Sequence, residues 1–107
     1  SEAVVNAVRE GFLVRRLGRV RYAGKDDAVR LFELVAEKDD SDAKLAEAMS
    51  AFEEGLTRYE ARDYRGARER FARCLRLLPG DGPSSFYIER CGKQGPHGEP
   101  GITSIPG

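Results

Sequence analysis

Residues 48–81 carry the pattern of two amphipathic helices joined by a tight turn at Asp63. Apolar residues recur at helical spacing on both sides of the turn, and Pro79 with Gly80 ends the second run. Two antiparallel helices approach closely only where one contact surface is small, and Gly55 and Ala67 supply small residues at the crossing. The positions that carry the pattern are Gly55, Tyr59, Tyr64, Ala67, Phe71, Leu75 and Pro79. This helical hairpin is therefore the element around which the chain is predicted to fold.

The same positions resemble one tetratricopeptide (TPR) unit, except that Ala51, beside Phe52, stands where the repeat has an aromatic residue. About three such units are normally needed for independent stability, so a single one must pack on another element or on a partner chain. We expect the repeat to pack through Gly55, Tyr64, Ala67, Phe71, Leu75 and Pro79. The outward positions of its first helix, where a short peptide groove would form, are Met49, Phe52, Leu56 and Tyr59.

The residues before the repeat change period. Residues 2–10 predict a short helix, and residues 12–17 predict a strand that Gly18 breaks. Residues 19–23 and 28–35 predict two further strands joined by the turn Gly24–Asp27. A polar connector at 36–42 follows, with Ser41 or Asp42 as the cap of the next helix. A lone hairpin is marginally stable in water, so it must lean on other elements.

After the repeat, Pro83 is expected to open a third short helix, in which Phe86, Tyr87 and Cys91 cover the repeat. The Gly- and Pro-rich residues 92–107 are expected to form no regular secondary structure. The predicted fold class is α+β: an N-terminal helix and β-hairpin, then a TPR-like helical hairpin and a short capping helix. The predicted segments are the helix and hairpin (1–36), a connector with the start of the next helix (37–47), the helical hairpin with its capping helix (48–92) and a Gly- and Pro-rich tail (93–107).

Lysines plus arginines and acids number 18 each, which argues against a nucleic-acid binder. Charge is nevertheless segregated. Residues 37–54 hold seven acids against two lysines, whereas residues 58–76 hold seven arginines against three acids. The simplest interpretation is two helix faces that complement each other when the helices fold back antiparallel. A patch for RNA or a phosphoprotein on the arginine side is the alternative.

Few residues are candidates for chemistry. Cys74 and Cys91 match no metal or redox spacing, and Cys74 lies in an apolar stripe where a small core residue is expected. His97 is the single histidine and cannot assemble a metal site or a catalytic triad alone. No apolar run approaches the ~20 residues that span a bilayer, and no basic-plus-apolar leader opens the chain. Unpaired cysteines without a leader favour the cytoplasm.

The first 35 residues resemble the C-terminal end of a class III adenylate/guanylate cyclase catalytic domain. The resemblance rests on Ser1-Glu2, Phe12, Leu17-Gly18, the run Val20 to Lys25 and the run Val29 to Leu34. The residues that follow, with a closing DGPSSFYIERC, resemble extensions found after some bacterial cyclase domains. The resemblance implies a parent protein that makes cyclic nucleotide from ATP, or from GTP, with two divalent metals (Mg²⁺ or Mn²⁺) held by aspartates before Ser1.

The family's hairpin carries Lys-Gly-Lys, whose lysine can reach the nucleotide. Lys25 matches the second lysine, while Ala23 replaces the first. An ordinary exposed turn lysine is the other interpretation. No catalytic residue, metal ligand or cofactor is assigned within these 107 residues. The expected role is therefore interaction: self-association as a homodimer, or docking of a regulatory protein by the TPR-like region. A stand-alone TPR adaptor is the first alternative, and an RNA-binding module is the weakest.

Overall fold

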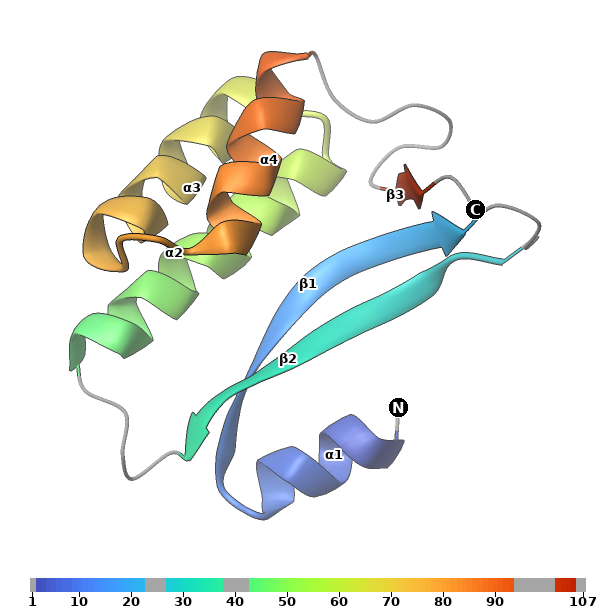
Figure 1. Ribbon diagram of the computed structural model, residues 1–107, viewed down its shortest axis with the longest axis vertical. Coiled ribbons are helices and arrows are strands. Elements are labelled where there is room, and N and C mark those ends of the chain that lie inside the picture. Colours follow the sequence, from blue (N-terminus) through green and yellow to red (C-terminus); the bar gives the residue numbers. More distant parts are fainter. Residues whose placement is uncertain (1, 23–26, 38–42, 94–101, 106–107) are drawn as a thin grey trace.

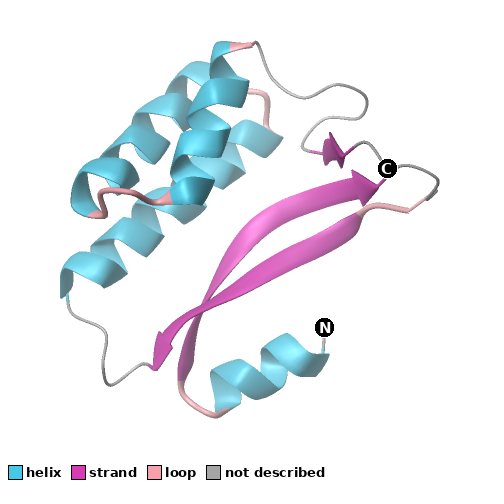
Figure 2. Ribbon diagram, viewed as in Figure 1, coloured by secondary structure: helices cyan, strands magenta, loops and turns pink. Residues whose placement is uncertain are grey.

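The computed structural model describes residues 2–22, 27–37, 43–93 and 102–105. The elements in chain order are α1 (Glu2–Arg9), β1 (Phe12–Tyr22), β2 (Val29–Glu37), α2 (Ala43–Glu60), α3 (Tyr64–Leu77), α4 (Gly82–Gly92) and β3 (Ile102–Ile105). A long twisted hairpin of β1 and β2 lies between α1 on one side and the group α2–α4 on the other (Figure 1). Helices and strands occupy separate parts of the molecule, as Figure 2 shows, and the α+β class is confirmed.

The core lies among α2, α3 and α4. Its residues are Ala48, Met49, Ala51, Phe52, Leu56 and Tyr59 of α2, Ala67, Phe71 and Cys74 of α3, and Tyr87 and Cys91 of α4. Leu13, Leu17 and Val35 of the hairpin pack against it. The hairpin therefore packs on the helical group, as expected for a hairpin that is only marginally stable by itself.

Gly18 does not break the first strand, contrary to the sequence-based expectation. β1 runs through it as one strand of 11 residues, and the register with β2 shifts between Arg16 and Gly18. Gly18 has a φ of +115°, a conformation that costs glycine little and other residues much. The glycine thus permits a β-bulge, which bends a strand without ending it.

The prediction of no regular structure after residue 92 is wrong for Ile102–Ile105. These residues form β3, which pairs in parallel with β1 from Arg19 to Tyr22 and gives the sheet order β2-β1-β3. β-Branched residues favour strands, and the open edge of β1 offers a row of unpaired backbone groups. His97 and the predicted caps Ser41 and Asp42 lie outside the described residues.

The helix ends follow local chemistry. Asp63 caps α3, since its Oδ1 accepts a hydrogen bond of 3.0 Å from the Gly66 N–H. Arg62, just after α2, has a left-handed φ of 65°. The Arg62 N–H donates to the Tyr59 carbonyl and the Asp63 N–H to the Arg58 carbonyl, which is the Schellman pattern. α4 begins at Gly82 rather than at Pro83, because the capping residue is Asp81.

Candidate functional site

Arg15, in the middle of β1, is the charged residue that joins the hairpin to the helices. It is only 5% exposed, and its guanidinium faces two carboxylates. Nη1 and Nη2 donate to the two oxygens of Asp81 at 2.8 and 2.9 Å, a bidentate pair. Nε and Nη2 donate to Glu33 Oε2 on β2 at 3.0 and 2.6 Å. The guanidinium also lies 4.6 Å from the centre of the Phe52 ring, so α2 contacts it as well.

Asp81 both pairs with Arg15 and caps the start of α4. Its Oδ2 accepts hydrogen bonds from the Ser84 N–H (3.2 Å) and the Ser84 hydroxyl (2.6 Å), and the Cys74 thiol lies 3.8 Å away. Burial on its own raises the pKa of Asp81, but the hydrogen bonds from Arg15 and Ser84 and the charge of Arg15 outweigh it. The pKa is therefore lowered, and the carboxylate is charged at neutral pH.

Arg16 and Leu17, the next two residues of β1, also bind the helices. Arg16 Nη2 lies 2.6 Å from Glu53 Oε2, and Nη1 lies 2.5 Å from Glu60 Oε2, both on α2. The hydrogen bond to Glu53 is the largest cause of the raised pKa of Arg16. The Leu17 carbonyl accepts a hydrogen bond of 2.6 Å from the Tyr87 hydroxyl. Leu17 makes this contact through its backbone and is the residue without a partner on β2, where the register shifts between Arg16 and Gly18.

Gly18 completes this junction by leaving room for α4. A Cβ atom on Gly18 would lie 2.3 Å from the Tyr87 hydroxyl oxygen and 3.6 Å from a Leu56 methyl group. The glycine therefore supplies both the backbone conformation of the bulge and the space for the Tyr87 hydrogen bond.

The predicted close approach of α2 and α3 is present. A Cβ on Gly55 would lie 2.9 Å from two carbons of the Phe71 ring, and Ala67 is fully buried. Phe71 stacks on Tyr87 with ring centres 5.1 Å apart, and Tyr59 meets Tyr87 edge-on at 4.9 Å. Of the other residues expected to pack the repeat, Tyr64 contacts the core, Leu75 is half-buried and Pro79 is exposed.

The structure corrects the expectation that four residues of α2 face outward. Met49 is 7% exposed, Phe52 0%, and Leu56 and Tyr59 each 1%. The reason is that the hairpin and α4 cover the face of α2 on which a peptide groove was expected, and Arg15 and Tyr87 contact it directly. These four side chains form core rather than a surface for a peptide.

The remaining candidates divide between core and surface. Cys74 and Cys91 are buried free thiols, as expected for Cys74. Burial raises the pKa of Cys91 to about 11. Tyr87 and Cys91 cover the repeat as predicted, but Phe86 is 46% exposed and does not. Lys25, the one nucleotide-binding candidate, lies outside the described residues.

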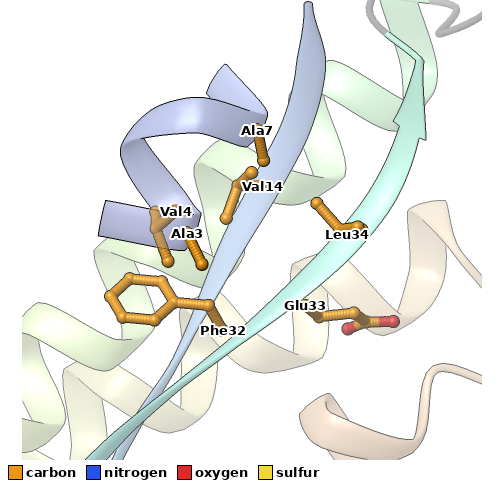
Figure 3. A pocket seen from close by; sticks show the side chains of 7 residues that line it. All are labelled: Ala3, Val4, Ala7, Val14, Phe32, Glu33 and Leu34. Carbon is orange, nitrogen blue, oxygen red and sulfur yellow. The ribbon is translucent and has the colours of Figure 1, made fainter. Parts of the chain in front are cut away.

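A shallow apolar cavity of about 170 Å³ lies on the other side of the hairpin, beneath α1. It is lined by Ala3, Val4, Ala7, Val14, Phe32, Glu33 and Leu34. The apolar side chains face one another across the gap between α1 and the strands, whereas the Glu33 carboxylate points away from α1 (Figure 3). No residue of α1 is buried. This face is thus apolar and open.

Sequence reasoning missed the junction of Arg15, Asp81 and Glu33. Arg15 and Asp81 are 66 positions apart, and nothing local links them. One signal was present in the sequence: an aspartate directly before Gly-Pro, where a helix begins. The strand gives no such signal, because it carries four arginines and nothing singles out Arg15.

Comparison with known proteins found one significant relative. The chain is 29% identical over 91 residues to "Adenylate cyclase, terminal-differentiation specific" of Dictyostelium discoideum. The match covers 84% of this chain but only 4% of that protein, so the chain spans a small part of its relative's length. No family model matches the chain, and no solved structure matches it. This similarity indicates a cyclase-related segment.

Proposed function

We propose that this chain is the C-terminal interaction and regulatory region of a class III adenylate cyclase, or of a guanylate cyclase. The motif order in residues 1–35 and the similarity to an adenylate cyclase both support this. A match over 91 of 107 residues must include β2, α2 and α3 as well as part of β1. The helical group, and not only the hairpin, thus has a counterpart in that cyclase.

The observation that carries the regulatory role is the buried pair of Arg15 and Asp81. Through it, the last strands of the proposed catalytic domain are bound to the start of α4. A partner that moved the helices would therefore move the hairpin. Chemistry belongs to the preceding catalytic domain in this proposal, and ATP and the two metals bind there. Within the described residues, no group of three or more His, Cys, Asp and Glu side chains could hold a metal ion.

The test measures cyclic nucleotide formation from ATP and from GTP by the full-length parent protein with Mn²⁺. Asp81→Asn weakens the junction, and Asp63→Asn is the matched control, because Asp63 is also a helix cap paired with an arginine but is exposed. We expect cyclic AMP from the wild type, a changed rate with Asp81→Asn and an unchanged rate with Asp63→Asn. Absence of product from both nucleotides contradicts the cyclase assignment. Equal rates in all three proteins contradict regulation through the junction.

We further propose that the chain self-associates as a homodimer through the α1 side of the hairpin. Val5 and Val8 of α1 are 52% and 56% exposed, Leu34 of β2 is 60% exposed, and the apolar cavity lies between α1 and β2. Contiguous apolar surface of this kind marks interaction sites. Sedimentation at about 100 μM should show a dimer that Leu34→Lys disrupts and that Phe86→Lys, an equally drastic change on α4, leaves intact. A monomer at that concentration refutes the dimer.

The alternative is a stand-alone TPR adaptor. The close packing of Gly55 on Phe71 favours it, because that contact is the steric feature of the repeat. A peptide-binding test with Tyr59→Ala or Phe52→Ala does not distinguish the two functions, since both side chains are core and their loss would unfold the chain. The cyclase assay separates the two functions: an adaptor makes no cyclic nucleotide in any length of parent chain.

The proposed location is the cytoplasm. Two free, buried cysteines fit a reducing compartment. Among the described residues, no helix is both long and apolar enough to cross a membrane.

A further inference from the structure

α3 carries more positive charge than its neighbours neutralise. Of its residues, five are arginines and one, Glu69, is an acid. Two of the arginines are matched by α2: Arg73 Nη2 lies 3.0 Å from Glu47, and Arg70 Nε lies 3.9 Å from Glu54. The antiparallel folding of the two helices thus pairs part of the charge, as the segregated sequence suggested.

The other three arginines form what we call the α3 arginine row: Arg65, Arg68 and Arg76. All three are exposed, and none has an ion pair within the described part of the chain. At 100° per residue, they project within an arc of about 80° along roughly 16 Å of helix. The small Ala72 lies between them. The arginine row is therefore a linear, cationic strip on one face.

We propose that the α3 arginine row docks an acidic helix of a partner protein. The other flank of α3 already binds an acidic helix in this way. There α2 lies alongside α3, and its Glu47 and Glu54, two turns apart, pair with two arginines. A second helix whose carboxylates have the spacing of Arg65, Arg68 and Arg76 can pair with the row in the same manner. The strip follows a single helix, includes Glu69 at its border, and belongs to a chain with no net charge, all of which favours a protein over a nucleic acid.

This inference names a partner class for the proposed interaction role, and it rests on that role but not on the cyclase assignment. Binding is measured on the 107-residue chain, so a negative result leaves the cyclic nucleotide assay untouched. The converse also holds, because a parent without cyclase activity could still bind an acidic helix.

The experiment titrates the chain with a labelled, alanine-rich helical peptide that carries glutamates at i, i+3 and i+11, the spacing of the α3 arginine row. A peptide with glutamine at those positions and a decamer of uridine serve as comparison probes, and fluorescence anisotropy is read at 50 and 300 mM salt. The test variant changes the three residues of the α3 arginine row to glutamine. The control variant removes the same charge from three exposed arginines elsewhere: Arg9, Arg19 and Arg30.

We expect the glutamate peptide to bind more tightly than the glutamine peptide, and the affinity to fall at 300 mM salt. The test variant should lose about tenfold in affinity, because each exposed ion pair contributes a factor of roughly 1.5 to 5. The control variant should change less than twofold. Equal losses in both variants, no binding of the glutamate peptide, or tighter binding of the uridine decamer would each overturn the proposal.

Discussion

The pair of Arg15 and Asp81 should contribute far more to stability than other ion pairs of this molecule. Both side chains are nearly buried, at 4% and 5% exposure. Removal of one partner from a buried pair typically costs about 3–5 kcal/mol, since the other charge is left in a poorly solvated site. In Asp81→Asn, the amide keeps the helix cap and Arg15 keeps Glu33. We therefore expect a loss of about 3 kcal/mol, which lowers Tm by roughly 10–20 °C.

Urea denaturation of four proteins measures this: wild type, Asp81→Asn, Arg15→Met and the double variant. Because the methionine stem fills the space beside Phe52, the double variant should cost little more than either single one. The coupling free energy between the two positions should then be about 2–3 kcal/mol. Asp63→Asn is the control, because its partner Arg58 is about half exposed and little should be lost. A coupling below about 1 kcal/mol, as at a surface pair, would refute the reasoning.

The same pair predicts a pH dependence. The folded pKa of Asp81 is lowered, so its contribution is fully present above the unfolded value of about 3.9 and is lost as pH falls through the folded pKa. The difference in unfolding free energy between wild type and Asp81→Asn should stay constant from pH 8 to about pH 5 and shrink below pH 4. A difference that grows on acidification contradicts the assigned direction.

Four further predictions concern single positions. Gly55→Ala gains about 1 kcal/mol of helix propensity but drives a Cβ into the fully buried Phe71 ring, so urea denaturation should show a net loss of about 1–2 kcal/mol. Gly82→Ala meets no atom within 4 Å and should be neutral. Arg62→Gly relieves a left-handed φ of 65° and should raise stability by about 1 kcal/mol in the same assay, whereas a loss would show that the arginine side chain matters more. Burial raises the pKa of Cys91 to about 11, so the thiol stays protonated at pH 8 in the folded chain. Mass spectrometry should then find it alkylated by iodoacetamide only when the chain unfolds.

The helical hairpin was predictable because its information is local. Small residues at Gly55 and Ala67, aromatic residues at fixed offsets, and the cap Asp63 all act within a few turns of helix. Those signals placed the two helices, the turn at Asp63 and the close approach at Gly55. The same locality explains one error. The apolar residues of α2 were divided into core and groove positions, although the pattern of one helix does not show which other elements cover it.

The features that the sequence did not predict are contacts between distant residues or depend on backbone conformation. β3 could not be foreseen because four residues in a Gly/Pro-rich stretch form a strand only when β1 offers them an edge. Gly18 was interpreted as a break because a glycine in a strand pattern signals either an end or a bulge. The local sequence does not distinguish them. Arg15 and Asp81 are 66 positions apart, so only the packing of the hairpin on the helices brings them together.

These long-range contacts bear on where the chain can be divided. Segments bounded near residue 36 follow the change of sequence pattern, yet Arg15, Arg16 and Leu17 bind partners on the far side of that boundary. A cut in the connector would leave the Asp81 carboxylate without its guanidinium and would uncover the aromatic group around Phe52. The loss of folding free energy would therefore be that of exposing part of a core and of breaking a buried ion pair, which is larger than that of cutting a linker. The hairpin and the helices therefore share one core and one set of buried contacts.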